Sequence, residues 1–247
     1  MRIFLAGASG VIGRRLVPML LEAGHEVHGG TRDERGAAVL RALGAVPCVA
    51  DVFDRAALHA AVRQSQPEVV IHQLTDLPAS LDPARMGEAI VRNARIRSEG
   101  TANLVAAALA AHCGRMVAQS ITWAYAPGGG VRRESDPLDL EAVGARATTV
   151  RGIAALEAAV LQTRGLAGTV LRYGHLYGPG TGIDEPTDPV RLHVDASAAA
   201  ALLAAQLGVP GVFNVCEPND QVSSVRAVEL LGWSPGFRLA DAIGSDR

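Results

Sequence analysis

Residues 3–13 read Ile-Phe-Leu-Ala-Gly-Ala-Ser-Gly-Val-Ile-Gly, a short apolar strand that runs directly into three regularly spaced glycines. This pattern predicts a strand-to-helix turn that binds a dinucleotide pyrophosphate. Gly7 permits the sharp turn, Gly10 lets the phosphates approach the backbone, and Gly13 lets the helix pack closely on the sheet. The unpaired N–H groups at the start of the helix would then face the anion. The other loop residues that we expect to contact the cofactor are Ser9, Val11 and Ile12.

Size and composition place the chain among ordinary globular proteins. It has 247 residues, of which 49% are hydrophobic and 19% are charged, and its net charge is −2. This charge gives no case for a nucleic-acid partner, and no apolar run is long enough to cross a membrane. Three cysteines far apart in the sequence are typical of reduced thiols, so we expect a cytoplasmic protein. All 23 basic Lys or Arg residues are arginine, which excludes any mechanism that needs a lysine amine.

Strands and helices alternate along the chain, which predicts a doubly wound α/β Rossmann fold with a parallel sheet. We expect a single dinucleotide-binding domain over residues 1–247, in which residues from about 174 to 240 contribute a small, truncated substrate lobe. After the first strand, the expected strands are Glu26–Gly30, Ala45–Ala50, Glu68–Leu74, Arg115–Ile121, Gly168–Arg172 and Val212–Val215. The expected helices are Val11–Ala23, Glu34–Leu43, Arg55–Gln64, Pro83–Ala111, Leu140–Thr163, Asp195–Leu207 and Ser223–Leu231, and Gly174–Pro189 is expected to be a loop.

The end of the second expected strand indicates which nicotinamide cofactor fits. An acidic residue there would bond the ribose 2′-hydroxyl and repel a 2′-phosphate, but this chain has Thr31 and Arg32. A guanidinium pairs a phosphate through two hydrogen bonds, and the threonine adds a hydroxyl. The sequence therefore favours NADP, with NAD still possible. The alternative is that Arg32 is a solvated side chain beside Asp33 and Glu34.

Several further segments carry a resemblance to a known family. They are Ala50-Asp51-Val52, Val70-Ile71-His72-Gln73-Leu74, Gly100-Thr101-Ala102-Asn103-Leu104, Leu171-Arg172-Tyr173-Gly174-His175-Leu176-Tyr177-Gly178-Pro179-Gly180, His193-Val194-Asp195 and Phe213-Asn214-Val215. With the glycine loop, they make the chain resemble an extended or atypical short-chain dehydrogenase/reductase of the NAD-dependent epimerase/dehydratase group, over nearly its whole length.

The resemblance also implies roles for individual residues. In such proteins Asp51, with Val52 beside it, would face the adenine, and Gln73 and Leu74 would line the adenosine ribose. The helix that carries Asn93 would support the nicotinamide side. Asp51 could equally cap the helix that follows it.

The resemblance also shows that this chain lacks the catalytic residues of the group. Members of this group use a tyrosine as acid and base, with a lysine four residues later that lowers its pKa and holds the nicotinamide ribose. These two positions fall on Thr149 and Ile153, and the usual hydroxyl residue falls on Ile121. An isoleucine neither transfers a proton nor carries charge, so the standard mechanism is absent.

Candidate substitutes lie at the carboxyl edge of the expected sheet, where open α/β folds place their sites. Tyr125 and His175 are the candidate acid/base groups, although each could equally have a structural role. Arg151 could supply charge only, and His72 is expected to be a bonded core histidine. No histidine spacing indicates a metal site. The expected substrate-binding residues are Ser120, Thr122, Tyr125, Tyr173 and His175.

These features lead to three hypotheses about function. The first is an NADP-dependent oxidoreductase that acts on a small molecule without the usual tyrosine–lysine pair. The alternative is a catalytically silent NADP-binding redox sensor or regulatory subunit, and a sugar-nucleotide epimerase or dehydratase is disfavoured because only residues 181–192 separate the Gly-Pro-Gly turn from His193. We expect a monomer, or a homodimer formed through the two longest helices.

Overall fold

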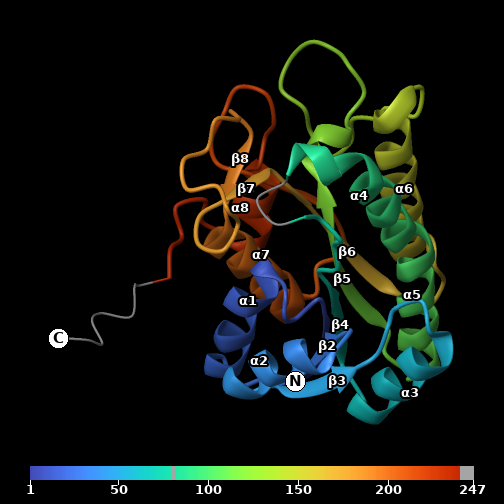
Figure 1. Cartoon of the computed structure of the whole chain (residues 1–247). Coiled ribbons are helices and arrows are strands. Elements are labelled where there is room, and N and C mark those ends of the chain that lie inside the picture. Colours follow the sequence, from blue (N-terminus) through green and yellow to red (C-terminus); the bar gives the residue numbers. More distant parts are fainter. Residues whose placement is uncertain (79–81, 240–247) are drawn as a thin grey trace.

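A seven-stranded parallel sheet forms the centre of the fold, in the strand order β3-β2-β1-β4-β5-β6-β9. The computed structural model describes residues 1–78 and 82–239 (Figure 1). The strand order reverses at β1, because Ala6 lies opposite Gly30 on one side and His72 on the other. Ligands of such sheets bind in the crevice outside the carboxyl ends of the strands at this point. The strands are β1 (Arg2–Ala6), β2 (Glu26–Thr31), β3 (Val46–Val49), β4 (Val69–His72), β5 (Arg115–Ile121), β6 (Ala167–Tyr173) and β9 (Gly211–Val215).

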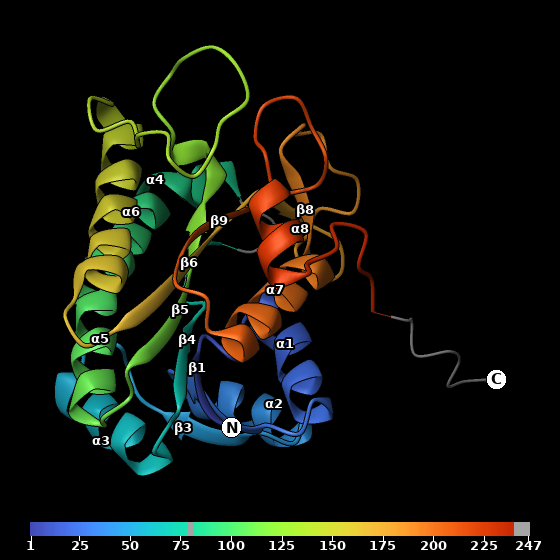
Figure 2. The same ribbon diagram turned by 180° about the vertical axis from the view of Figure 1, so that it is seen from behind.

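Helices cover both faces of the sheet, as Figures 1 and 2 show from opposite sides. One face carries α1 (Val11–Glu22), α2 (Glu34–Ala42), α7 (Val194–Leu207) and α8 (Val225–Leu231). The other carries α3 (Arg55–Ser65), α4 (Pro83–Arg95), α5 (Thr101–Ala110) and α6 (Gly144–Gln162). This layering confirms the predicted doubly wound α/β Rossmann fold.

The first strand explains why both faces are covered. Side chains alternate along a strand, so Ile3 and Leu5 enter the core beneath α1 and α7, whereas Phe4 and Ala6 enter the core beneath α3 and α5. All four are at most 3% exposed. An apolar run of this kind is stable only between two layers of helices, which is the arrangement of parallel sheets.

Three expected elements differ from the observed ones. The helix expected over Pro83–Ala111 contains a π-helical turn at Ile96–Gly100, which separates α4 from α5. The helix expected from Leu140 begins at Gly144, because residues before it pair elsewhere: Leu138 bridges Tyr125, and the Asp139 N–H donates to the Ala124 carbonyl. The expected loop Gly174–Pro189 contains a short strand.

That strand is β7 (His175–Tyr177), and it pairs in parallel with β8 (Arg191–His193) outside the main sheet. The rest of the region that was expected to form a substrate lobe belongs to the main fold. Its α7 packs on α1, and β9 completes the main sheet beside β6. The C-terminal region is thus joined to the Rossmann layers, and the buried Trp233 indole strengthens this join by donating to the Ala196 carbonyl.

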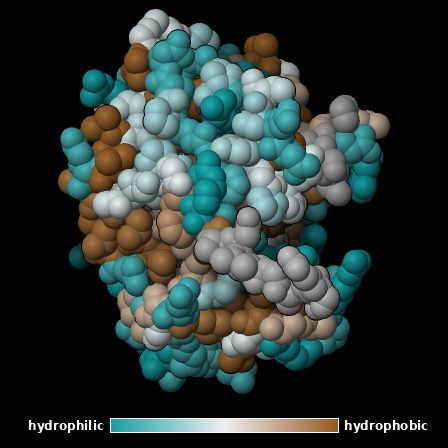
Figure 3. Space-filling model, turned by 90° about the vertical axis from the view of Figure 1, so that its left-hand side faces the viewer, coloured by the Kyte–Doolittle hydropathy of each residue, from teal (hydrophilic) through white to brown (hydrophobic). Residues whose placement is uncertain are grey.

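The surface on the side of α1 and α2 shows hydrophilic and hydrophobic residues intermixed, with apolar side chains gathered toward the left of the view (Figure 3). Among the described residues, no helix is both long and apolar enough to span a membrane.

Candidate functional site

The glycine loop between β1 and α1 has the tight geometry that a pyrophosphate-binding turn requires. Gly7 adopts φ +84°, and a Cβ there would lie 2.7 Å from the Gln73 carbonyl oxygen. A Cβ at Gly13 would lie 2.4 Å from the Ala8 carbonyl oxygen. Because these neighbours are backbone atoms that cannot rotate away, only glycine fits at either position. The loop therefore presents bare backbone to the crevice.

The start of α1 leaves its amide groups available to a ligand. The residue before the helix is Gly10, in an extended conformation, and no side chain caps the first turn. By contrast, α2 and α3 are capped by Asp33 and Asp54, whose carboxylates accept from backbone N–H groups. An uncapped, glycine-lined helix start is a favourable place for a phosphate, because the free N–H groups and the helix dipole both attract negative charge.

A cavity of about 360 Å³ lies in front of this loop, at the carboxyl ends of β1, β2 and β4. Of the predicted cofactor residues, those that line it are Gly7, Ser9, Gly10, Thr31, Arg32, Asp51, Val52 and Leu74. Its apolar end is formed by Phe4, Phe53, Leu58, Ile96 and Leu104. A polar loop beside an apolar pocket fits the pyrophosphate and the adenine of a dinucleotide, so the residues present fit the cofactor that the fold implies.

Charged side chains surround the mouth of this cavity. Arg32 is mostly exposed, and its guanidinium lies 3.7 Å from Asp76, which also pairs with Arg92 at 3.0 Å. Thr31 is buried, and its hydroxyl lies 3.2 Å from the Ser9 hydroxyl. Arg32 thus has a carboxylate neighbour at the site while most of its side chain stays in solvent, and its contact with a 2′-phosphate stays a prediction. Sequence reasoning missed Asp76 and Arg92, which belong to no recognisable motif.

Asp51 does not cap the helix after it, so that alternative is wrong. Its carboxylate accepts from the Phe53 N–H at 2.9 Å, and the cap of α3 is Asp54. Contact of Asp51 with an adenine stays a prediction.

The remaining predicted cofactor residues do not line the cavity. Ile12 is buried in the core, and Val11 is partly exposed at the helix start. Asn93 is buried, and its side-chain oxygen accepts from the Asp76 N–H at 3.3 Å. Gln73 is also buried and donates to the Tyr173 hydroxyl, while its Oε1 is without a partner in the described part of the chain. Asn93 thus holds the loop after β4 at Asp76, and Gln73 joins the start of this loop to Tyr173 on β6.

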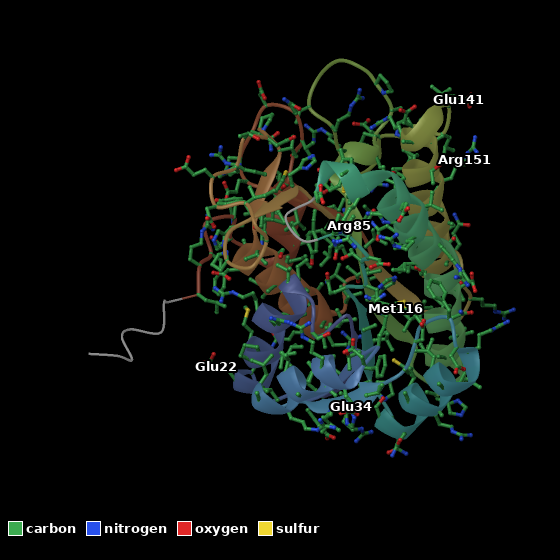
Figure 4. The ribbon with its side chains drawn as sticks, in the orientation of Figure 1. Glu22, Glu34, Arg85, Met116, Glu141 and Arg151 are labelled. Carbon is green, nitrogen blue, oxygen red and sulfur yellow. The ribbon has the colours of Figure 1, made fainter. Side chains whose placement is uncertain are left out.

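The positions of the missing lysine and of the usual hydroxyl residue are filled by an apolar cluster. Ile121 and Ile153 pack together with Ala124 and Val150, and all four are at most 1% exposed. Thr149 is half-buried on α6, and Arg151 is exposed and points outwards from that helix (Figure 4). The two isoleucine positions therefore supply neither a proton donor nor a positive charge.

Tyr125 is tied into a buried polar network. Its hydroxyl donates to the Asn214 side-chain oxygen at 2.7 Å, and its ring lies against the Arg172 guanidinium. Arg172 in turn forms a two-pronged ion pair with Glu157. Burial raises the pKa of Tyr125, although Arg172 opposes this effect. A tyrosine acting as a base at neutral pH needs a lowered pKa, so this environment does not suit the acid/base role predicted for Tyr125.

His175 has a more open position. Its ring stacks on Trp123, with centroids 4.1 Å apart, and its Nε2 lies 3.3 Å from Asp188. Burial lowers the pKa of His175, and Asp188 partly offsets this shift. The imidazole is therefore mainly neutral at pH 7 and could accept, rather than donate, a proton. Trp123, which is 38% exposed, was missed because a lone tryptophan after a strand carries no recognisable signal.

The other predicted substrate residues are committed to the core. Ser120 is fully buried and donates to Glu157, and Thr122 donates to the Tyr173 carbonyl. Tyr173 donates to the Ser197 carbonyl, and burial raises its pKa. The prediction that these three contact substrate disagrees with the structure, because each is at most 2% exposed and its hydroxyl donates to a group inside the protein.

His72 is the bonded core histidine that the sequence predicts. Its Nε2 lies 3.0 Å from the Thr101 hydroxyl, its Nδ1 accepts from the Leu74 N–H, and burial lowers its pKa to about 4. Within residues 1–78 and 82–239, no group of His, Cys, Asp and Glu side chains is arranged to hold a metal ion.

Comparison with known proteins gives both a family match and relatives. The model of the NAD dependent epimerase/dehydratase family matches residues 3–214. A "3-diazoavenalumate denitrifying reductase" from Streptomyces is 44% identical over 236 residues, covering 93% of this chain and 72% of that protein. An uncharacterized protein of Schizosaccharomyces pombe is 49% identical over 72 residues, covering 29% of this chain and 24% of that protein.

Solved structures with the same fold include two sugar-nucleotide enzymes. The dTDP-glucose 4,6-dehydratase of Streptomyces venezuelae, with NAD bound, superimposes with a TM-score of 0.78 at 18% identity, covering 98% of this chain and 94% of that one. The UDP-glucose 4-epimerase of Thermotoga maritima gives a TM-score of 0.76 at 20% identity, with coverage of 96% and 94%. At these identities the likeness establishes the fold.

Proposed function

The chain belongs to the NAD-dependent epimerase/dehydratase family, and from that premise we propose that it is a nicotinamide-dependent reductase of a small aromatic diazo compound. The observation that carries the proposal is the apolar cluster that contains Ile121 and Ile153, the positions of the family's hydroxyl residue and lysine. The reaction must therefore need no proton from the protein at the reacting atom. The 44% identical relative is named as a denitrifying reductase of a diazo compound, which supports this class of substrate.

Whether a site must supply a proton depends on the substrate that accepts the hydride. A carbonyl that accepts hydride becomes an alkoxide, so an enzyme that reduces it needs a general acid. A reduced nicotinamide supplies a hydride when it is bound. Transfer of that hydride to an arenediazonium ion needs no proton, because Ar–N₂⁺ + H⁻ gives Ar–H and N₂. The leaving group is neutral dinitrogen, so no residue has to protonate it.

The chain's own residues would then bind, orient and exclude water. The glycine loop and the start of α1 would hold the pyrophosphate, and the cavity beside Phe53 would hold the adenine. Trp123 and His175 offer an aromatic face at the carboxyl edge of β5 and β6. The cluster that contains Ile121 and Ile153 would keep water away from the reacting carbon.

NADPH is the cofactor that we propose, because Arg32 follows β2 at the nucleotide cavity and its guanidinium could pair with a 2′-phosphate. A charge-assisted pair of this kind contributes about 1.5 kcal/mol or more, which corresponds to about tenfold in affinity. Arg32→Ala should therefore raise the Kd of NADPH roughly tenfold and leave the Kd of NADH unchanged. Arg35→Ala is the matched control, because Arg35 is exposed on α2 and does not line the cavity. Equal effects on both cofactors, or none, would contradict the NADPH assignment.

The reaction is tested with deuterium-labelled cofactor. The purified protein is incubated with NADPH that carries deuterium at the transferring C4 position and with a hydroxyl-substituted arenediazonium ion. We expect release of dinitrogen, loss of absorbance at the NADPH band, and deuterium on the ring carbon that carried the diazo group. A reaction without protein gives the background rate. Turnover of aldehydes or ketones in preference to the diazo compound, or product without deuterium, would overturn the proposal.

The second candidate is a catalytically silent NADPH-binding regulator, which the same apolar cluster also favours. The two candidates differ in one outcome. Tight NADPH binding without turnover of diazo compounds, aldehydes, ketones or quinones would establish the regulator, and turnover of any of them would exclude it.

A further inference from the structure

A buried arginine without a counter-charge lies beside the proposed reaction site. Arg97 is only 7% exposed and sits in the π-helical turn Ile96–Gly100. Among residues 1–78 and 82–239, no carboxylate pairs with it and no side-chain or backbone atom forms a hydrogen bond to its guanidinium. The other buried arginine of the core, Arg172, has a two-pronged carboxylate partner. Arg97 is thus an exception that needs an explanation.

Two neighbours on the same helical face fix where Arg97 lies. Asn93, four residues earlier, contacts the backbone of Asp76 just after β4. Thr101, four residues later, contacts His72 at the end of β4. Residues four apart lie one above the other on a helix, so Arg97 lies between these two contacts, alongside the carboxyl end of β4. The positive charge of Arg97 also contributes to lowering the pKa of His72, which places it near that strand.

The same turn borders the helix that would carry the missing lysine. The π-helical turn packs against α6, and one turn before Arg97 the two helices approach so closely that a Cβ on Gly152 would lie 3.0 Å from the Ala94 Cα. Ile153 is the next residue along α6. Arg97 therefore lies on a turn that packs against α6 and close to the end of β4. Single π-helical turns are often found at functional sites.

The guanidinium remains charged and keeps a small exposed surface. Burial lowers the pKa of Arg97 to about 10, which still leaves it protonated at neutral pH. In the described part of the chain, the only fully enclosed side-chain polar atom without a partner is Gln73 Oε1. The nitrogens of Arg97 are therefore not sealed in protein, although most of the side chain is. A largely desolvated cation that keeps some exposed surface attracts an anion strongly.

We propose that Arg97 binds an anionic oxygen of the substrate, a carboxylate or a phenolate, and holds the aromatic ring at the reaction site. The identity of the ring rests on the proposed function, but the anion site does not. The cofactor's phosphates are the weaker assignment, because the nucleotide cavity is lined by Arg92, Arg95 and Ile96 and not by Arg97. Those phosphates are expected at the glycine loop, beyond β4 from Arg97.

Binding of benzoate and of neutral benzamide tests the site directly. Both are titrated by calorimetry into the protein saturated with NADP⁺. We expect benzoate to bind at least roughly tenfold more tightly than benzamide to the wild type. Arg97→Gln should remove this preference without changing the Kd of NADP⁺, and Arg97→Lys should restore part of it. Arg151→Gln is the control, since Arg151 is exposed on the far side of α6 and should leave both affinities unchanged.

Thermal unfolding separates a binding role from a structural one. An unpaired buried charge destabilises the fold, so Arg97→Met should raise the Tm by roughly 3 °C or more. A lower Tm would mean that the guanidinium has structural partners, and this would overturn the proposal. Equal binding of benzoate and benzamide to the wild type would overturn it too, as would an Arg97→Gln variant that loses NADP⁺ affinity only. Arg97-dependent benzoate binding without diazo turnover would instead refute the proposed function alone.

Discussion

The ion pair between Glu157 and Arg172 offers the most quantitative test of the structure. Arg172 on β6 donates from Nε and Nη2 to the two carboxylate oxygens of Glu157 on α6, at 2.8 and 2.6 Å. Ser120 on β5 donates to the same carboxylate at 2.7 Å. Arg172 and Glu157 are at most 6% exposed. One carboxylate therefore joins α6 to two neighbouring strands beneath the proposed reaction site.

Replacing Glu157 by alanine leaves a buried guanidinium and a buried hydroxyl without their acceptor. Removal of one partner of a buried ion pair destabilises a protein by about 3–5 kcal/mol, because the remaining charge stays desolvated. For a chain of this length each kcal/mol corresponds to about 2–4 °C in Tm, so we expect the Tm to fall by roughly 6–20 °C. The double variant Glu157→Met with Arg172→Met should recover much of this loss, since it leaves no charge unpaired.

Thermal and urea unfolding of the variants measure these differences. The matched control is Glu99→Ala, which breaks the solvent-exposed pair of Glu99 with Arg95 and should give no resolvable change in Tm. If Glu157→Ala lowered the Tm no more than this control, the Glu157 carboxylate would not be compensating a buried charge. A double variant as unstable as the single one would also refute the reasoning, because it would assign the loss to packing.

Three other perturbations give distinct outcomes. The pKa of His72 is about 4 in the folded protein and 6.5 in the unfolded chain, so the unfolded state binds more protons between these values and stability falls as the pH falls. Protonation of His72 should lower the free energy of unfolding by about 2 kcal/mol between pH 7 and pH 5. Urea unfolding at both pH values should show a smaller decrease in His72→Gln. Gly13→Ala places a Cβ 2.4 Å from the Ala8 carbonyl oxygen and should weaken NADPH binding at least roughly tenfold in a fluorescence titration, whereas Gly87→Ala, with open space around it, should not. Tyr125→Phe removes the hydrogen bond to Asn214 and should cost about 1–2 kcal/mol of stability at an unchanged kcat, and a large fall in kcat would instead make Tyr125 catalytic.

Local sequence predicts the features that depend on local chemistry. The glycine spacing after an apolar strand predicts the loop that the structure places at the crevice, with Gly7 and Gly13 sterically restricted to glycine. Alternation of strands and helices predicts the doubly wound sheet, because each element carries its own periodicity. The absence of the tyrosine–lysine pair is also readable, since it depends only on residue identity at Thr149 and Ile153.

Features that depend on distant partners could not be predicted. The strand β7 exists because His175 donates to the Val190 carbonyl, fifteen positions away. The sequence predicts that Tyr125 lies at the ligand-binding edge of the sheet, but in the structure its hydroxyl donates to Asn214 of β9 inside the fold. Arg97 lies in a helix rich in arginines, and nothing in its periodicity distinguishes a buried guanidinium from the exposed one of Arg95. The difference arises from the π-helical turn, which has no sequence signature of its own.

The isoleucines at the family's hydroxyl and lysine positions, Ile121 and Ile153, fit the proposed reaction because they exclude water. In a site that reduces a carbonyl, a lysine at position 153 would be useful, because its charge tunes the proton donor. In a site that delivers hydride to an arenediazonium ion, water is a competing nucleophile that would give a phenol instead of the arene. If the proposed reaction takes place beside it, the apolar cluster that contains Ile121, Val150 and Ile153 would reduce that competition by keeping the reacting carbon dry. The same replacement that removes the acid/base machinery would therefore favour the proposed reaction, while Glu157 and Arg172 preserve the scaffold around it.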